Sequence, residues 1–260
     1  MASCASARAP PSPADLSSNI RFSVVIPAYN EAGLLPRLLA TLDTARQRYT
    51  GGATRVEMIV ADNASTDATA ALARQHGCRV ARVEKRMIAA ARNGGASLAQ
   101  GDILCFVDAD MQVHPETFNV IDGALARGVF VAGATGVTSE RWSLGIVCTW
   151  AAMMPAVWLT GMDTGVVFCP RADFEAIGGY REDRLYAEDV VFLLSLKKHG
   201  RKAGRRLVRP RGARAIVSAR KFDQYGDWHM LFDLGAMCIN QLIAPRKAER
   251  QARAYWYEGR

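Results

Sequence analysis

The chain has 260 residues, 50% of them hydrophobic, and a formal net charge of +8 at pH 7. This length suits a single α/β domain, and the hydrophobic fraction is enough for a large core. The positive charge is compatible with polyanionic partners such as nucleotide phosphates, acidic lipid head groups or nucleic acid. Nucleic acid is disfavoured, because the sequence has no RNA-recognition signature of the form K/R-G-F-G-F-V-x-F.

The six cysteines are scattered and form no C-x-x-C pair, which argues against a zinc site and against a disulfide framework. A reducing, cytoplasmic location fits this pattern best. Residues 1–20 are rich in alanine, serine and proline and have no apolar stretch. We therefore expect a disordered N-terminal tail there, and not a signal peptide.

Strands and helices alternate through the first half of the chain. Short apolar runs predict buried strands at 22–26, 56–61, 78–83 and 103–107. Leucines at helical spacing predict a helix after the first strand: Leu34, Leu35, Leu38, Leu39 and Leu42. Further helices are expected near Asp67, with a serine or threonine cap, and over 87–100, where a glycine pair weakens the middle. The alternation predicts an α/β fold with a mostly parallel central sheet flanked by helices.

The second half of the chain is less regular. Residues 143–160 carry no charge and contain Pro155, which predicts a buried or interfacial pair of helices, with direct membrane contact as the alternative. A helix is expected over 189–199, ended by the next glycine, and a strand within 206–218. The last expected element is an apolar, mainly helical segment at 228–243.

Two carboxylates follow the fourth predicted strand in Asp108-Ala109-Asp110. In open α/β sheets, ligands bind at the carboxyl ends of the strands. Two carboxylates at such an end suit a hard divalent cation, and a cation there suits a diphosphate. The alternative reading is an acidic turn after a strand.

Polar motifs also follow the first and second predicted strands, and a further motif lies in the helix predicted over 87–100. Four motifs occur in this order: Pro27-Ala28-Tyr29-Asn30-Glu31, Asp62-Asn63-Ala64-Ser65-Thr66-Asp67, Ala91-Arg92-Asn93-Gly94-Gly95 and Asp108-Ala109-Asp110. Together they resemble the nucleotide-sugar domain of family 2 glycosyltransferases, which have the GT-A fold. The resemblance extends over about 22–200 and implies a Rossmann-like nucleotide-diphospho-sugar transferase.

The resemblance implies a donor site for a UDP- or GDP-linked sugar. Pro27, Tyr29 and Glu31 would line the nucleotide pocket. Asp62 would accept hydrogen bonds from the base, and Arg92 would lie near the base or the phosphates. The alternatives are a helix-entry turn residue for Asp62 and a solvent-facing helix residue for Arg92.

The resemblance also implies a bound Mn²⁺ or Mg²⁺. Asp108 would face the ribose or the metal, with Ala109 beside it, and Asp110 would ligate the metal through oxygen. Gln112 resembles the glutamine that completes the metal shell in members similar to dolichyl-phosphate-mannose synthase. His114 is expected to be a loop residue, since such a cation prefers oxygen ligands.

The second half of the resemblance concerns the acceptor. Glu188 and Asp189 match an acidic pair of the family, at a predicted helix start. An inverting transfer needs a base for the acceptor hydroxyl. Asp189 is the first choice and Glu188 the second, and the alternative is that both cap the helix. Arg220 and Lys221 would close over the diphosphate or be solvated at the surface. Asp227 stands where processive polymerases carry an arginine before tryptophan, which disfavours polymer synthesis.

These observations predict one GT-A domain over 21–260. Its nucleotide-sugar half would span about 21–115, its acceptor half about 116–222 and its apolar C-terminal segment about 223–260. The expected enzyme is an inverting, metal-dependent hexosyltransferase. A nucleotidyltransferase and a non-catalytic nucleotide-sugar-binding subunit are the alternatives. The sequence does not identify the molecule that carries the acceptor hydroxyl. The uncharged segment 143–160 is compatible with a lipid-linked acceptor and with peripheral contact at the inner face of the membrane. The oligomeric state is also left open.

Overall fold

The structure, a computed structural model, describes residues 20–160, 163, 165–183 and 188–232. Its main sheet has seven strands in the order β3-β2-β1-β4-β8-β6-β9. Their bounds are Arg79–Arg82, Val56–Asp62, Phe22–Ala28, Ile103–Phe106, Val167–Pro170, Phe130–Ala134 and Arg206–Val208, in that spatial order. The strands from β3 to β4 are parallel, and only β8 runs antiparallel to its neighbours. The predicted α/β fold with a mostly parallel sheet is confirmed.

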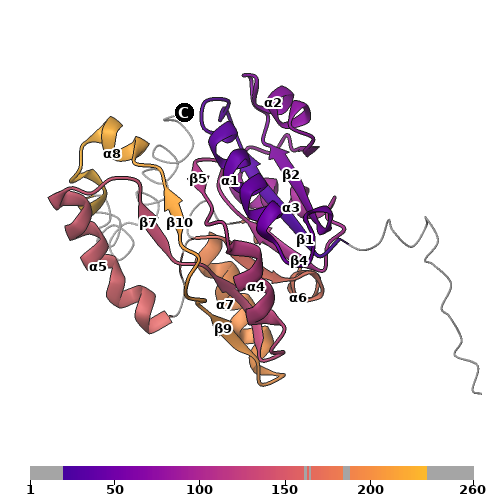
Figure 1. Cartoon of the computed structure of the whole chain (residues 1–260). Coiled ribbons are helices and arrows are strands. Elements are labelled where there is room, and N and C mark those ends of the chain that lie inside the picture. Colours follow the sequence, from indigo (N-terminus) through magenta and orange to yellow (C-terminus); the bar gives the residue numbers. More distant parts are fainter. Residues whose placement is uncertain (1–19, 161–162, 164, 184–187, 233–260) are drawn as a thin grey trace, which may run out of the picture.

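Helices cover both faces of this sheet (Figure 1). Side chains alternate along β1, so that Val24 and Ile26 face one core and Val25 faces the other. The first core contains α1 (Leu35–Arg48), α2 (Thr69–Gln75) and α4 (Thr117–Leu125). The second contains α3 (Ile88–Ala96), α6 (Arg171–Ile177) and α7 (Glu188–Arg201). A short 3₁₀ turn, η1 (Ala53–Arg55), precedes β2.

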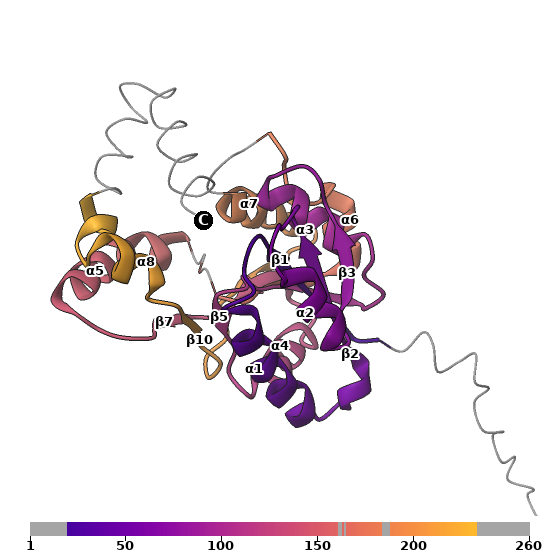
Figure 2. The same cartoon turned by 90° about the horizontal axis from the view of Figure 1, so that it is seen from above.

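A small second sheet joins the end of β4 to the late part of the chain. It consists of β5 (Met111–Gln112), β10 (Ala215–Val217) and β7 (Val137–Ser139). Beyond it, α5 (Leu144–Thr160) and α8 (Arg220–Tyr225) lie side by side, away from the main sheet, in both views (Figures 1 and 2). Because β5 directly follows Asp110, this sheet carries α8 toward the carboxyl end of β4.

The sequence predicts that the first strand ends before Pro27, but β1 continues to Ala28. The carbonyl of Val25 accepts from the β4 side, and the carbonyl of Ala28 accepts from Asn63 on the β2 side. Pro27, two residues after Val25, therefore faces the β4 side, where β4 has already ended at Phe106. Its missing N–H costs no ladder hydrogen bond.

The glycines of two helices have a packing role that the sequence did not reveal. A Cβ atom on Gly95 would lie 2.4 Å from Val25 Cγ1, so the glycine lets α3 approach the sheet closely. Likewise a Cβ on Gly200 would lie 2.7 Å from Val131, and α7 runs through this glycine to Arg201 instead of stopping. The predicted stop at Gly200 is wrong by one residue, since α7 ends at Arg201. The predicted extent 87–100 is also wrong, because α3 ends at Ala96 and the N–H groups two and three residues beyond it donate to carbonyls three residues earlier, which tightens the last turn.

Three further expectations need correction. The range 143–160 forms one helix that includes Pro155, not a pair of helices. The range 206–218 contains two strands, β9 and β10, in different sheets. Helix α2 has no serine or threonine cap; instead Asp67 Oδ1 accepts from the Thr69 backbone N–H at 2.9 Å. The predicted tail up to residue 19 and residues 233–260 lie outside the described residues.

Candidate functional site

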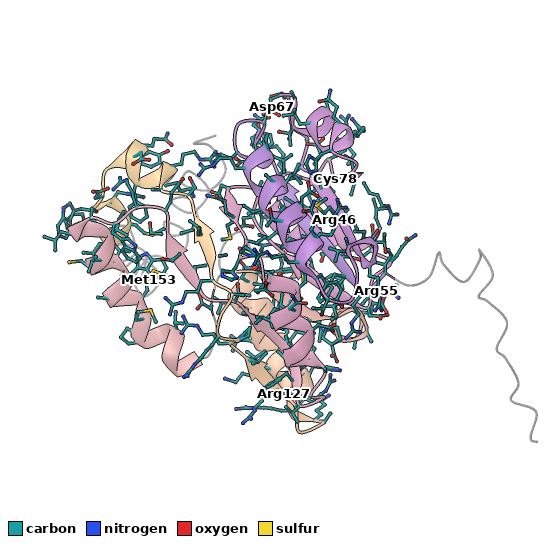
Figure 3. All side chains as sticks on the ribbon, viewed as in Figure 1. Arg46, Arg55, Asp67, Cys78, Arg127 and Met153 are labelled. Atoms are coloured by element: carbon teal, nitrogen blue, oxygen red, sulfur yellow. The ribbon has the colours of Figure 1, made fainter. Side chains whose placement is uncertain are left out.

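The predicted donor residues meet at the carboxyl ends of β1, β2 and β4. Figure 3 shows Asp67 at this end of the sheet, and Arg55 and Arg127 at the opposite end. A pocket lies here that encloses about 30 Å³. Its lining residues are Pro27, Ala28, Tyr29, Glu31, Asn63, Ile88, Ala91, Asp108, Ala109 and Asp110. The structure thus brings six predicted donor residues together, while a nucleotide needs a wider opening than this.

The loops after β1 and β2 are tied to each other. Asn30 Oδ1 accepts from the Thr66 N–H at 2.9 Å, and the Asn30 N–H donates to Ser65 Oγ at 3.1 Å. Asn30 and Ala64 both have positive φ, at 52° and 60°, which L-residues rarely adopt. Such strain persists only where the surrounding contacts impose it. The two loops therefore form one rigid wall of the pocket.

Asp62 is buried, and its Oδ1 accepts from the Ser65 N–H at 3.1 Å. It is not among the residues that line the pocket, so its contact with the base stays a prediction. Its neighbour Asn63 does line the pocket, which the sequence reasoning missed. The Asn63 amide donates to the carbonyls of Val83 and Lys85 at 3.0 and 2.7 Å, and so holds the loop before α3.

That loop places a second missed residue over the pocket. The Arg86 guanidinium lies 3.8 Å from the centre of the Tyr29 ring, a cation–π contact. Tyr29 is therefore covered on one face by an arginine about sixty residues further along the chain. A basic residue three positions after a strand carries no distinctive sequence signal.

Arg92 joins the donor side of the site to the predicted acceptor side. Its Nη2 donates to Asp108 Oδ1 at 2.9 Å. Its Nη1 donates to Glu188 Oε1 at 2.9 Å and to Asp189 Oδ1 at 2.5 Å. The Arg92 side chain is only 4% exposed, so the alternative of a solvent-facing residue is wrong. A buried guanidinium with three carboxylates is a strong electrostatic junction.

Burial makes the Asp189 carboxyl a weaker acid than usual. It raises the pKa of the Asp189 carboxyl from its ordinary 3.8 to about 7, while Arg92 acts in the opposite direction and Glu188 and Asp108 add to the rise. The two carboxylates lie in the first turn of α7, where the helix dipole also favours negative charge. A carboxylate with a pKa near neutrality suits a general base.

Asn93 holds the segment that leads to this acidic pair. Its Nδ2 donates to the Tyr180 carbonyl at 2.9 Å and to Glu182 Oε1 at 3.0 Å, and its Oδ1 accepts from the Tyr180 N–H at 2.9 Å. A Cβ atom on Gly179, whose φ is +75°, would lie 2.7 Å from Asn93 Oδ1. Only glycine fits this close approach.

Arg220, on α8, contacts two of the carboxylates that line the pocket. Its two Nη atoms donate to the two carboxylate oxygens of Glu31 at 2.9 and 3.0 Å. Its Nη2 also lies 3.7 Å from Asp110 Oδ2. The Glu31 side chain is 2% exposed. This contact contradicts the alternative that Arg220 is only solvated at the surface.

The residues present fit a hard divalent cation. Asp108 and Asp110 supply carboxylate oxygens from one pocket wall, and the Asp108 side chain is 36% exposed. Gln112 lies in β5 opposite Ile216 of β10, two residues from Asp110. No group of three His, Cys, Asp or Glu residues in the described ranges is arranged to hold an ion. Mg²⁺ is usually bound by one or two carboxylates plus substrate phosphates.

None of the helices in the described part of the chain has the length and apolarity to cross a bilayer. Helix α5 has 17 residues without a charge, and several apolar side chains are exposed at its start. They are Trp142, Leu144 and Val147, at 52%, 72% and 47%.

Part of this chain is similar in sequence to known glycosyltransferases. Residues 23–144 match the family model described as glycosyl transferase family 2. The validoxylamine A glucosyltransferase of Streptomyces hygroscopicus subsp. jinggangensis is 41% identical over 101 residues, which are 36% of this chain and 23% of that protein. The matches span between 23% and 39% of the length of seven curated relatives.

Solved structures share the fold. A crystal structure of S. aureus TarS in complex with UDP-GlcNAc has a TM-score of 0.59 at 18% identity, over 76% of this chain and 58% of that one. The mannosyltransferase PcManGT of Pyrobaculum calidifontis, in complex with GDP-Man and Mn²⁺, has a TM-score of 0.59 at 22% identity, over 75% of this chain and 56% of that one. These likenesses confirm the expected GT-A fold.

Proposed function

Because residues 23–144 match the model of glycosyl transferase family 2 and the chain has the GT-A fold, we propose that it transfers a sugar from a UDP- or GDP-linked donor to an acceptor hydroxyl, with inversion and with a divalent cation. One observation carries the proposal: buried Arg92 contacts Asp108 at the donor pocket and Glu188 and Asp189 on α7 at the same time. Donor and acceptor chemistry thereby meet at one guanidinium.

On the donor side, Pro27, Tyr29 and Glu31 form the wall against which the nucleotide packs, and Asp62 reads the base through hydrogen bonds. Asp110, Asp108 and Gln112 would hold Mn²⁺ or Mg²⁺. A bound cation of this kind supplies positive charge that stabilises the leaving diphosphate. The complexes of TarS with UDP-GlcNAc and of PcManGT with GDP-Man and Mn²⁺ support this class of donor.

On the acceptor side, Asp189 takes the proton of the attacking hydroxyl. The acceptor oxygen attacks the anomeric carbon from the face opposite the diphosphate, which inverts the configuration there. Arg92 orients the Asp189 carboxylate, and Glu188 positions the acceptor. The donor half would be 21–115 and the acceptor half 116–222, with Arg92 and α7 as their junction.

The two alternatives are less well supported. A nucleotidyltransferase usually needs a glycine-rich loop of the G-x-G-T-R type after the first strand, and residues 27–31 contain no glycine. A non-catalytic binding subunit does not need the Glu188-Asp189 pair held at the donor site. The exposed apolar start of α5 supports peripheral membrane contact and a lipid-linked acceptor. Incubation of the protein with radiolabelled UDP- and GDP-sugars and Mn²⁺, followed by detection of transfer or donor hydrolysis, tests the enzymatic function itself.

Replacing Asp110 by alanine is expected to abolish metal-dependent donor binding. The variant loses one of the two carboxylates, Asp108 and Asp110, that line the pocket at the end of β4. Calorimetric titration with UDP and GDP, with and without Mn²⁺, measures the effect. Asp102→Ala is the matched control, because this carboxylate lies at the opposite end of the same strand and pairs with Arg21 at 3.4 Å. Equal metal-dependent affinity in both variants would refute the metal assignment.

The pH dependence of the reaction is expected to follow Asp189. A base must be ionised, so kcat/KM is expected to rise with pH and level off above about 7, the pKa of Asp189. The folded state binds the proton more tightly than the unfolded chain, so this carboxyl's stabilising contribution is full below pH 3.8 and is lost as pH rises to about 7. Urea unfolding of the wild type and Asp189→Asn across this range measures that slope, which the variant should lack.

A further inference from the structure

Arg220 pairs with carboxylates that line the donor pocket, in a way that the proposed function does not require. It lies on α8, 189 residues after Glu31, and makes a two-pronged hydrogen bond with that carboxylate. Glu31 is 2% exposed, so the arginine neutralises a charge that burial would otherwise penalise. The same guanidinium lies 3.7 Å from Asp110, the carboxylate assigned to the metal.

The fold places this arginine firmly. Strand β10 pairs with β5 through Val217 opposite Met111, and Met111 directly follows Asp110. Three residues beyond Val217 the chain returns Arg220 to the same carboxylate. The Arg220 N–H also donates to Ser218 Oγ at 3.2 Å, which orders the turn into α8. The guanidinium is therefore held beside Asp110 by the small sheet as well as by Glu31.

A divalent cation on Asp110 would lie close to this positive group. Mg²⁺ binds carboxylate oxygens at about 2.0–2.1 Å. With the guanidinium 3.7 Å from Asp110 Oδ2, the two cations would share one carboxylate in a partly buried pocket, where repulsion is poorly screened. The negative charge of a diphosphate would offset the two positive charges and so relieve that repulsion.

We propose that Arg220 competes with the divalent cation for Asp110, so that the cation binds well only together with the diphosphate of the donor. This inference rests on the metal-dependent donor site of the proposed function. Arg220 thus couples metal binding to donor binding, and by linkage it makes each ligand strengthen the binding of the other.

The test is a thermodynamic cycle on the full chain with Mn²⁺ and UDP as the probes. Loss of the free Mn²⁺ signal in electron paramagnetic resonance gives the Mn²⁺ affinity with and without UDP. Arg220→Gln keeps a hydrogen-bond donor for Glu31 but loses the charge. It is expected to bind Mn²⁺ alone about tenfold more tightly than the wild type, since the competing cation is gone. The gain in Mn²⁺ affinity that UDP produces should shrink by a similar factor.

Two variants serve as controls. Arg220→Lys keeps the positive charge and should bind Mn²⁺ alone as weakly as the wild type. Arg37→Ala removes a positive charge from a surface groove that Arg220 also lines, and Arg37 pairs there with Glu140. This variant should not change the Mn²⁺ affinity. Equal or weaker Mn²⁺ binding by Arg220→Gln in the absence of UDP overturns the inference, while the proposed function stands if UDP and Mn²⁺ still bind together. Failure of every variant and of the wild type to bind Mn²⁺ even with UDP overturns both.

A second measurement on the wild type guards against a folding defect in the variant. If Mn²⁺ displaces Arg220 from Asp110, hydrogen exchange of the α8 amides, at 220–225, should become faster when Mn²⁺ is added without UDP. Unchanged or slower exchange at saturating Mn²⁺ contradicts the displacement.

Discussion

Replacing Asp189 by asparagine is expected to lower turnover by about 10²–10⁴-fold, the usual contribution of a general base. Asparagine has nearly the same shape and can still accept a hydrogen bond from Arg92, but it cannot take a proton at neutral pH. Donor affinity should change little, because Asp189 does not line the donor pocket. Steady-state kinetics and calorimetry with UDP or GDP separate these two effects.

The neighbouring carboxylate is the matched control for this experiment. Glu188 binds the same Nη1 atom of Arg92, at 2.9 Å, and differs by one position on the first turn of α7. Glu188→Gln should keep most of its turnover and raise the KM for the acceptor. If Glu188→Gln loses turnover and Asp189→Asn keeps it, the two roles are exchanged. If both variants stay active, the base lies outside this pair.

Replacing Arg92 by alanine is expected to lower the free energy of unfolding by about 3–5 kcal/mol, the usual cost of breaking a buried ion pair from one side. The side chain is 4% exposed and pairs with three carboxylates, which would then repel one another without compensation. Turnover should also be lost, because Asp108 and Asp189 would no longer be held at one point. Urea unfolding and kinetics on the same preparation measure both effects.

Two further variants define the origin of the Arg92 effect. Arg92→Lys keeps one positive charge but cannot bridge three carboxylates, so its stability should lie between those of the wild type and Arg92→Ala. Arg82 pairs with Glu84 at 2.6 Å with both side chains more than 70% exposed, and Arg82→Ala should leave the urea midpoint unchanged. A loss in Arg92→Ala no larger than in Arg82→Ala would show that the junction does not stabilise the fold.

Local patterns in the sequence predict the positions of the first helix, the first four strands and part of the pocket. The leucines of α1 repeat at helical spacing, and Leu35, Leu38, Leu39 and Leu42 are all buried as predicted. The strand pattern located β1, β2, β3 and β4, and the polar residues after β1 and β4 predicted the pocket wall formed by Tyr29, Asp108 and Asp110. Such inferences work because helix and strand periodicity and the polarity of strand ends are encoded over a few residues.

Which residues far apart in the sequence contact one another depends on the tertiary structure. Pro27 stays within β1 because β4 ends earlier on the side that the proline faces, and the close approach of α7 to Val131 leaves no room for a Cβ atom at Gly200. Arg92 binds carboxylates 16 and 97 residues away, and Arg220 binds Glu31 across 189 residues. These pairings depend on sheet order and on burial, which make a long-range ion pair strong, and neither property is present in a local stretch of sequence.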